Sequence, residues 1–160
     1  MLRSLASLAA IAALYGGAVA QGCPIQSIAT TNFDYNPDDY TTMAVGFDAS
    51  TCQLTLEMLK NPNITIGNYY LTQHYLMVGD VLLLPPFPLP QPFYGHDLLI
   101  LPGDVIGPLP GGKSALTLPN NPALVGKHFF LQGIAEFITT VHFPIEPEYV
   151  LLHGVSLTLQ

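Results

Sequence analysis

The oxygen-bearing side chains that could bind a metal ion gather in one acidic stretch. Asp34, Asn36 and Asp38 occupy alternate positions there, and Asp39 follows directly. An oxygen-rich calcium loop begins in this way, because Ca²⁺ prefers carboxylate and amide oxygens. The rest of such a loop is not reproduced, since Asp39 stands where glycine is required and Val45 where glutamate is required. The stretch therefore indicates either a calcium site of another type or a solvent-exposed acidic turn.

The residues from 107 to 114 match the pattern of a phosphate-binding loop, Gly followed after four residues by Gly-Lys-Ser. Such a loop surrounds phosphate with consecutive backbone N–H groups and continues into a helix at the lysine. Pro108 and Pro110 have no N–H, and the residues after Lys113 alternate as a strand does. We therefore expect a hairpin loop here and no nucleotide partner.

The histidines do not have the spacing of a metal site. They are His74, His96, His128, His142 and His153. His74 and His153 fall in expected strands as single buried residues, and His96-Asp97 is a local pair of the kind found in turns. The chain has no Gly-x-Ser-x-Gly motif, so a serine hydrolase would need a triad assembled from distant parts of the chain. The sequence therefore predicts no catalytic residue.

Several aromatic residues could stack on a sugar or contact an apolar partner. The candidates for ligand binding are Tyr69, Tyr70, Phe87, Phe93 and Tyr94. Prolines dominate residues 85–93, and a segment with so few N–H groups is expected to form an extended connection outside a sheet. Its rings then either face a ligand or close the core.

The first twenty residues are typical of a secretory signal peptide. Arg3 precedes an apolar stretch, and the small residues Ala18 and Ala20 frame a cleavage site. The apolar stretch is too short to span a membrane. Cleavage after Ala20 leaves residues 21–160, whose length suits a single domain.

The chain has two cysteines, Cys23 and Cys52. In an oxidising compartment the expected result is one disulfide between them. The residues before Cys23 also fit a bacterial lipoprotein box loosely, and in that alternative Cys23 carries a lipid that anchors the protein. The sequence therefore predicts a secreted or periplasmic protein, with lipid anchoring as the second interpretation.

The composition argues against a nucleic-acid-binding protein and against an intrinsically disordered one. Lysine and arginine total 4 against 11 acidic residues, which gives a net charge of −7. Such a chain repels phosphate backbones, so nucleic acid is not expected as a partner. Because 49% of the residues are hydrophobic and only 9% are charged, the chain can bury enough apolar surface to fold.

Period-two alternation predicts strands throughout the rest of the chain. Residues 52–58 alternate without a fault, with Leu54 and Leu56 on one face and Thr55 on the other. The expected strands are Ile25–Thr31, Tyr40–Phe47, Cys52–Met58, Asn68–Val78, Asp80–Leu84, His96–Leu101, Ser114–Leu118, Lys127–Ile138 and Tyr149–Leu159. Residues 121–126 are long enough for a single helical turn only. We expect an all-β protein, an antiparallel β-sandwich of about eight short strands.

The C-terminal half resembles small secreted β-sandwich domains that recur in exported proteins of planctomycete-type bacteria. The resemblance lies in Ser114–Gly126, where a strand ending in Leu-Pro precedes an Asn-Pro-Ala-Leu-x-Gly turn. It continues in Phe129–Gly133 and in the final strand Gly154–Leu159, and it covers roughly residues 96 to 160. It implies a small exported β-sandwich of unknown role, with no catalytic residues to transfer.

The features together favour an exported, non-enzymatic domain that acts in surface structure, adhesion or the binding of a ligand such as a carbohydrate. One alternative is an extracellular hydrolase with a dispersed site. The other is a calcium-stabilised module that uses Asp34, Asp38 and Asp39.

Overall fold

The computed structural model describes residues 22–36, 39, 41–61, 69–90, 93–110, 112–139 and 147–160, and the expected signal segment, residues 1–20, lies outside them. The described residues form eleven strands and one short 3₁₀ turn, η1. Their bounds are β1 (Ile28–Phe33), β2 (Thr41–Asp48), β3 (Gln53–Lys60), β4 (Tyr69–Gly79), β5 (Val81–Phe87), β6 (Phe93–Gly95), β7 (Leu98–Leu101), β8 (Asp104–Pro110), β9 (Lys113–Thr117), η1 (Pro122–Leu124), β10 (His128–Thr139) and β11 (Pro147–Leu159).

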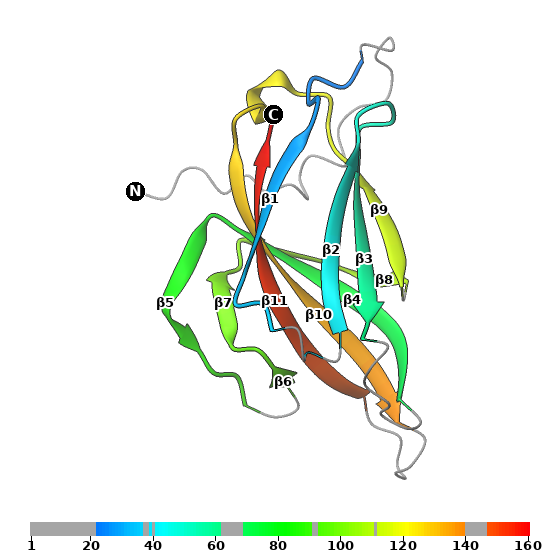
Figure 1. Cartoon of the computed structure of the whole chain (residues 1–160), viewed down its shortest axis with the longest axis vertical. Helices are drawn as coiled ribbons and strands as arrows, with labels where there is room; N and C mark the ends of the chain where they lie inside the picture. Colours follow the sequence, from blue (N-terminus) through cyan, green and yellow to red (C-terminus); the bar gives the residue numbers. More distant parts are fainter. Residues whose placement is uncertain are drawn as a thin grey trace.

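Two antiparallel sheets face each other (Figure 1). The large sheet has the order β1-β11-β10-β4-β8, and β6 joins it by pairing in parallel with β11. The facing sheet has three strands in the order β2-β3-β9. The predicted all-β antiparallel architecture is confirmed, with eleven strands in the described residues rather than about eight.

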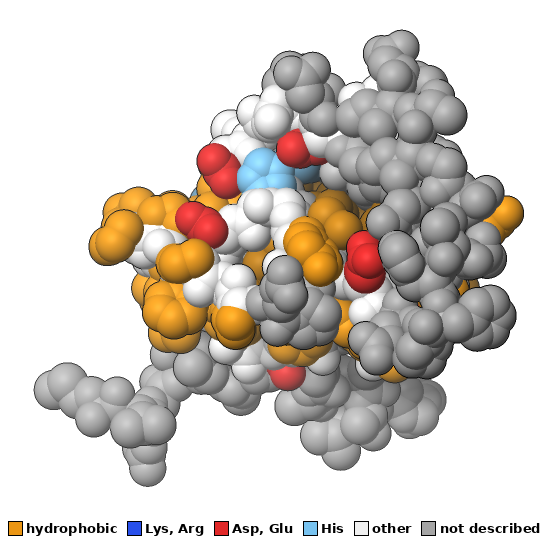
Figure 2. Space-filling model, turned by 90° about the horizontal axis from the view of Figure 1, so that it is seen from below, with side chains coloured by type: hydrophobic (Ala, Val, Ile, Leu, Met, Phe, Trp, Pro, Cys, Tyr) orange, Lys and Arg blue, Asp and Glu red, His pale blue; other side chains and the backbone are white. Residues whose placement is uncertain are grey.

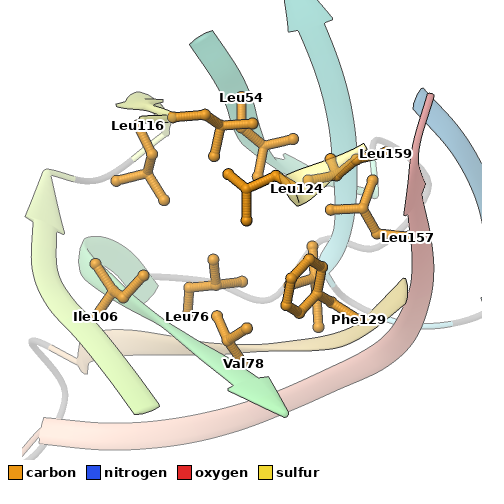
Figure 3. Close-up of a pocket in the computed structure, with 11 residues that line it drawn as sticks. Leu54, Leu76, Val78, Ile106, Leu116, Leu124, Phe129, Leu157 and Leu159 are labelled. Atoms are coloured by element: carbon orange, nitrogen blue, oxygen red, sulfur yellow. The ribbon is translucent and has the colours of Figure 1, made fainter. Parts of the chain in front are cut away.

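The core fills the space between the two sheets with side chains from alternate strand positions. In β3, Leu54, Leu56 and Met58 point inward, as the period-two pattern predicts, and they share one buried cluster with Leu131 and Leu152 of the large sheet. At one end this core surrounds a cavity of about 20 Å³, lined by apolar side chains alone (Figure 3). A space of that size holds a single water molecule at most, so it is a packing gap and too small for a ligand.

The pair β5 and β7 forms a small layer on the outer side of the large sheet. Leu99 and Ile100 of this pair are buried against Met77 and Leu151. β5 continues through the prolines to Phe87, so the prediction that residues 85–87 lie outside a sheet is wrong. The pairing of β5 with β7 is interrupted between Leu82 and Phe87, and such an irregularity tolerates residues without an N–H.

The segment that matches the phosphate-loop pattern connects the two sheets. β8 ends at Pro110 and pairs with β4, whereas β9 begins at Lys113 and pairs with β3. The expected hairpin is therefore wrong, because these consecutive strands belong to different sheets. Lys113 starts a strand and not a helix, so the backbone context that this motif requires is missing. The predicted single turn at residues 121–126 is confirmed as η1, with Asn121 as its N-cap.

The expected disulfide is confirmed between Cys23 and Cys52. It joins the segment before β1, in the large sheet, to the turn before β3, in the facing sheet. A sulfur held in a disulfide does not carry a lipid thioether at the same time, so this state of Cys23 differs from the lipid-anchored alternative. Within the described residues, no helix combines the length and the apolar character that a membrane crossing needs.

Replacing both cysteines by serine is expected to lower the free energy of unfolding by about 3 kcal/mol, since the bond closes a loop of roughly 30 residues in the unfolded chain. Urea unfolding with and without a reductant measures this loss. Reduced wild type serves as the control and should match the variant. Equal stability of the oxidised wild type and the variant would contradict the prediction.

Candidate functional site

A β-bulge places a buried histidine at the edge of the sandwich. The pairing of β10 with β11 shifts between Gln132 and Ile134, so that Gly133 alone lies opposite Leu152 and His153. An extra residue in one strand interrupts the regular alternation of side chains. Gly133 suits this position because a Cβ there would press against Leu152. The bulge therefore directs His153 toward β2, at the edge of the facing sheet.

Two short strands lie end to end along one edge of β11. β1 pairs with the part of β11 after the bulge, and β6 pairs with the part before it. The chain leaves β1 at Asp34 and leaves β6 at His96. The backbone N–H of His96 donates to the carbonyl of Leu151 at 3.1 Å, which fixes this turn against β11. Asp34 and His96 therefore meet beside His153, although they are 62 positions apart in the sequence.

His96 is held between two carboxylates. Its Nδ1 lies 2.7 Å from Oδ2 of Asp34, and its Nε2 lies 2.6 Å from Oδ2 of Asp39. We call these three side chains the histidine clamp. The N–H of Asp39 donates to the carbonyl of Asn36, and the carbonyl of Asp39 accepts from Nδ2 of Asn61, both at 3.1 Å. The clamp thus fastens the segment between β1 and β2 to the turn after β6.

The clamp favours the charged form of its histidine. Burial of the ring lowers the pKa of His96, but hydrogen bonds and charges from Asp39 and Asp34 outweigh burial and raise the pKa above its ordinary value of 6.5. Carboxylate oxygens only accept hydrogen bonds, so a ring bonded to one on each side is protonated at both nitrogens. The clamp is therefore an imidazolium between two carboxylates.

His153 lies beside the clamp in the opposite state. Its ring centroid is 6.5 Å from that of His96, and the ring of Tyr35 packs against it edge-on at 5.2 Å. Complete burial, and then the nearby charge of His96, lower the pKa of His153, so the ring is neutral. The Met43 carbonyl faces the ring outside hydrogen-bonding geometry, and no other described residue supplies a partner for either ring nitrogen.

A pocket of about 330 Å³ adjoins His153 at the seam between the two sheets. We call it the seam pocket. Its lining residues are Thr30, Asn32, Tyr35, Thr42, Met43, Ala44, Val45, Leu59, His153 and Val155. They come from both sheets, because β1 is the edge strand of one and β2 the edge strand of the other. The pocket is therefore built by two sheet edges that do not pair with each other.

The inward positions of β1 change from apolar to polar along the strand. Thr30 pairs with Leu157 and Asn32 pairs with Val155, and directly paired residues project to the same side of a sheet. Leu157 and Val155 belong to the core. Thr30 and Asn32 are nevertheless exposed at this edge of the sheet, so polar side chains suit these positions. Here they supply hydroxyl and amide groups to the seam pocket.

The proposed calcium ligands are only partly brought together. Asp34 and Asp39 converge, but their carboxylates lie on opposite sides of the His96 ring and do not face a common cation. Asn36 lies in the intervening turn, and Asp38 is outside the described residues. Among the residues that the structure describes, no three metal-binding side chains are arranged to hold an ion. The geometry therefore assigns these aspartates to the clamp.

The aromatic candidates lie away from the seam pocket. Tyr70, Phe87 and Tyr94 are exposed, and Phe93 is half-buried against another tyrosine ring. The side chain of Tyr69 is outside the described part of the structure. None of the others lines the pocket. Exposed rings on these strands remain available for contact, but no described cavity brings them together with polar groups.

Two further histidines bond to hydroxyl groups. Nε2 of His74 lies 3.0 Å from Oγ of Ser114, and Nδ1 of His128 lies 3.0 Å from Oγ1 of Thr158. The ring of His74 is fully buried between β4 and β9, and burial lowers its pKa. In the described structure its other nitrogen has no hydrogen-bonding partner, since the Pro110 carbonyl lies near it without the required geometry. This Ser–His pair links the two sheets and lacks the carboxylate of a triad.

The residues of the site were largely missed by sequence reasoning. The burial of His153 is confirmed, but its neighbours Tyr35 and His96 were not foreseen. The expected local pair of His96 with Asp97 is wrong, because both ring nitrogens bind the aspartates of the clamp. These contacts join residues that are far apart in the sequence, and no local pattern reveals them.

Comparisons with family models, with curated proteins and with solved structures find no match to this chain. The resemblance to planctomycete-type exported domains therefore stays a prediction. The function has to be inferred from the geometry of the site.

Removing the charge of Asp39 is expected to destabilise the fold more than removing that of Asp34. Their side chains are 18% and 53% exposed, so water screens the second interaction more strongly. Asp39→Asn should lower the free energy of unfolding by about 1.5–3 kcal/mol, and Asp34→Asn by less than about 1 kcal/mol. Urea unfolding near pH 6 measures both. Equal losses would contradict this ranking.

The two neighbouring histidines are expected to change stability in opposite directions with pH. Folding raises the pKa of His96. Its contribution to the free energy of unfolding is therefore complete below pH 6.5 and is lost as the pH rises through the raised pKa. Folding lowers the pKa of His153. Its contribution to the free energy of unfolding is therefore present above pH 6.5 and is lost as the pH falls through the lowered pKa.

Urea unfolding of the wild type, His96→Gln and His153→Leu between about pH 5 and pH 9 separates these effects. His96→Gln should flatten the alkaline side of the profile, and His153→Leu should flatten the acid side. If neither substitution changes the shape of the profile, the opposite protonation states are refuted.

Proposed function

We propose that this chain is an exported, non-enzymatic binding domain that takes a small ligand in the seam pocket. The observation that carries the proposal is His153, which is fully buried beside the pocket with both ring nitrogens unpartnered in the described structure. Buried polar groups are almost always hydrogen-bonded, because an unpaired one costs about 1–3 kcal/mol. A ligand that bonds to this ring would recover that cost.

The dimensions and lining of the pocket support binding of a small molecule. Its volume of about 330 Å³ lies at the lower end of the range for ligand sites, roughly 300–1,000 Å³. Apolar side chains such as Val45 and Leu59 lie next to polar ones such as Thr42 and Asn32. Ligand sites combine an apolar lining with a few polar groups in the same way.

The histidines of the site support binding rather than catalysis. A general base needs a nitrogen that can take a proton, and both nitrogens of His96 are engaged by carboxylates. His153 is neutral, but no described serine, cysteine or carboxylate bonds to it. The hydrolase alternative is left with the pair of His74 and Ser114, whose histidine is buried inside the sandwich.

Export is supported by the bond between Cys23 and Cys52, because disulfides persist in oxidising compartments. The signal-like residues 1–20 agree with that placement. The protein is accordingly secreted or periplasmic, and surface structure or adhesion would follow from what the pocket binds.

His153→Leu is expected to abolish ligand binding and to raise the free energy of unfolding by about 1 kcal/mol, because leucine has a similar size and leaves no buried polar atom unpaired. Urea unfolding measures the stability. Amide chemical shifts of β1, β2 and β11, recorded against a library of soluble sugars, polyols and small amides, measure the binding. His128→Leu, at an exposed position of β10, is the matched control and should keep binding.

A structural role for His153 predicts the reverse, a less stable His153→Leu variant. The proposal is also rejected if no compound of the library shifts the pocket resonances of the wild type. The role given to His153 is rejected if the same compounds shift the resonances of His153→Leu equally.

A further inference from the structure

The hydrogen-bonding capacity of the buried ring restricts what can bind to it. A neutral imidazole donates from one nitrogen and accepts at the other. A hydroxyl group can serve either nitrogen, because it donates and accepts. One hydroxyl of a ligand would therefore suit a ring nitrogen of His153 in either role, and neither nitrogen has a protein partner in the described structure.

The walls of the pocket continue this pattern. Thr30, Asn32 and Thr42 place two hydroxyls and one amide around the same space. Tyr35 adds an aromatic ring that is 51% exposed and already packs against His153. Aromatic faces bind the apolar C–H face of a sugar, while its hydroxyls turn toward polar groups. The lining therefore offers both surfaces that a sugar ring needs.

The charges near the pocket disfavour an anion. The clamp holds two carboxylates around one imidazolium, and neither lysine nor arginine lines the pocket. On the face of the molecule in Figure 2, the described side chains include histidine and acidic residues but no lysine or arginine. A cation is not favoured either, because Asp34 and Asp39 bond to His96 and are not part of the lining. An uncharged ligand fits this environment best.

Other parts of the molecule offer weaker sites. The cavity of about 20 Å³ in Figure 3 is wholly apolar and too small. The exposed apolar side chains of β5 and β7, including Leu84 and Leu101, form a surface for which nothing in the structure identifies a partner. Glu136 is buried on the outer face, but Thr72 and Gln73 already bond to its carboxylate at 2.8 Å.

We propose that the seam pocket binds a single uncharged sugar residue, with one of its hydroxyls on a ring nitrogen of His153 and one face of the sugar ring against Tyr35. This inference rests on the proposed binding function and specifies its ligand class. It implies that the pocket discriminates against acidic sugars, whose carboxylate would meet a neutral ring and a nearby pair of aspartates.

The experiment compares neutral sugars with their acidic counterparts. Glucose, galactose and mannose are titrated into the full chain, alongside glucuronic, galacturonic and mannuronic acid, with amide chemical shifts as the readout. At least one neutral sugar should shift the resonances of β1, β2 and β11, and its uronic acid should bind at least about tenfold more weakly, equivalent to 1.4 kcal/mol.

Variants of Tyr35 test the stacking contact. Tyr35→Ala should weaken the bound sugar by about tenfold, whereas Tyr35→Phe keeps the ring and should bind nearly as well as the wild type. A weakening of equal size in both variants would refute stacking and leave only a role for the phenolic hydroxyl. His153→Leu should abolish the shifts.

The outcomes separate the two proposals. Tighter binding of a uronic acid than of its neutral counterpart overturns the sugar assignment, while loss of that binding in His153→Leu preserves the binding function. Absence of shifts with every sugar of the panel also overturns the assignment. If a compound binds the seam pocket equally well in the wild type and in His153→Leu, the contact with His153 is rejected, and if no compound binds there the binding function itself is rejected.

Discussion

The site depends on a gap in the pairing of one strand. β11 has 13 residues, and its outer edge is covered by β1 and β6, which have 6 and 3 residues. The two short strands leave the bulge at Leu152 and His153 between them. Since each short strand ends at this gap, the chain must turn there twice. Those turns supply Asp34 and His96, and the bulge supplies the buried ring beside them.

The two histidines at this gap differ in hydrogen bonding, because the ring nitrogens of one have partners and those of the other do not. His96 has a charged partner on each side, and bonds of this kind are roughly twice as strong as neutral ones. His153 lies 6.5 Å away, from ring centroid to ring centroid, with neither nitrogen bonded to a described residue. The charge on the first ring helps to keep the second neutral. A charged group with two partners thus lies beside a neutral group with spare hydrogen-bonding capacity, and the proposed binding function rests on the second of these.

Local patterns predicted much of this fold and little of its site. Alternation located the long strands, as in β3, because inward and outward environments repeat every two residues. β6 and β8 were missed, since proline and glycine within residues 93–95 and 104–110 obscure that period. The bulge at His153 has no local signature, because it depends on the register with β10. The clamp joins residues from two segments, one between β1 and β2 and one after β6, and only the topology brings them together. The sequence gives one hint of the seam pocket. Thr30 and Asn32 are polar and alternate on the same face of β1 as the apolar Ile28.

The disulfide has a further consequence for the pocket. From Cys23 the chain runs along β1, through the aspartates of the clamp, back along β2 and into Cys52, where the sulfur bond closes the circuit. Most of the residues that line the pocket belong to this covalently closed loop. β1 and β2 do not pair with each other, but this loop joins them at one end through the disulfide and at the other through the segment that carries the aspartates. The two walls that these strands contribute to the pocket are therefore tethered to each other at both ends, which limits how far they can separate.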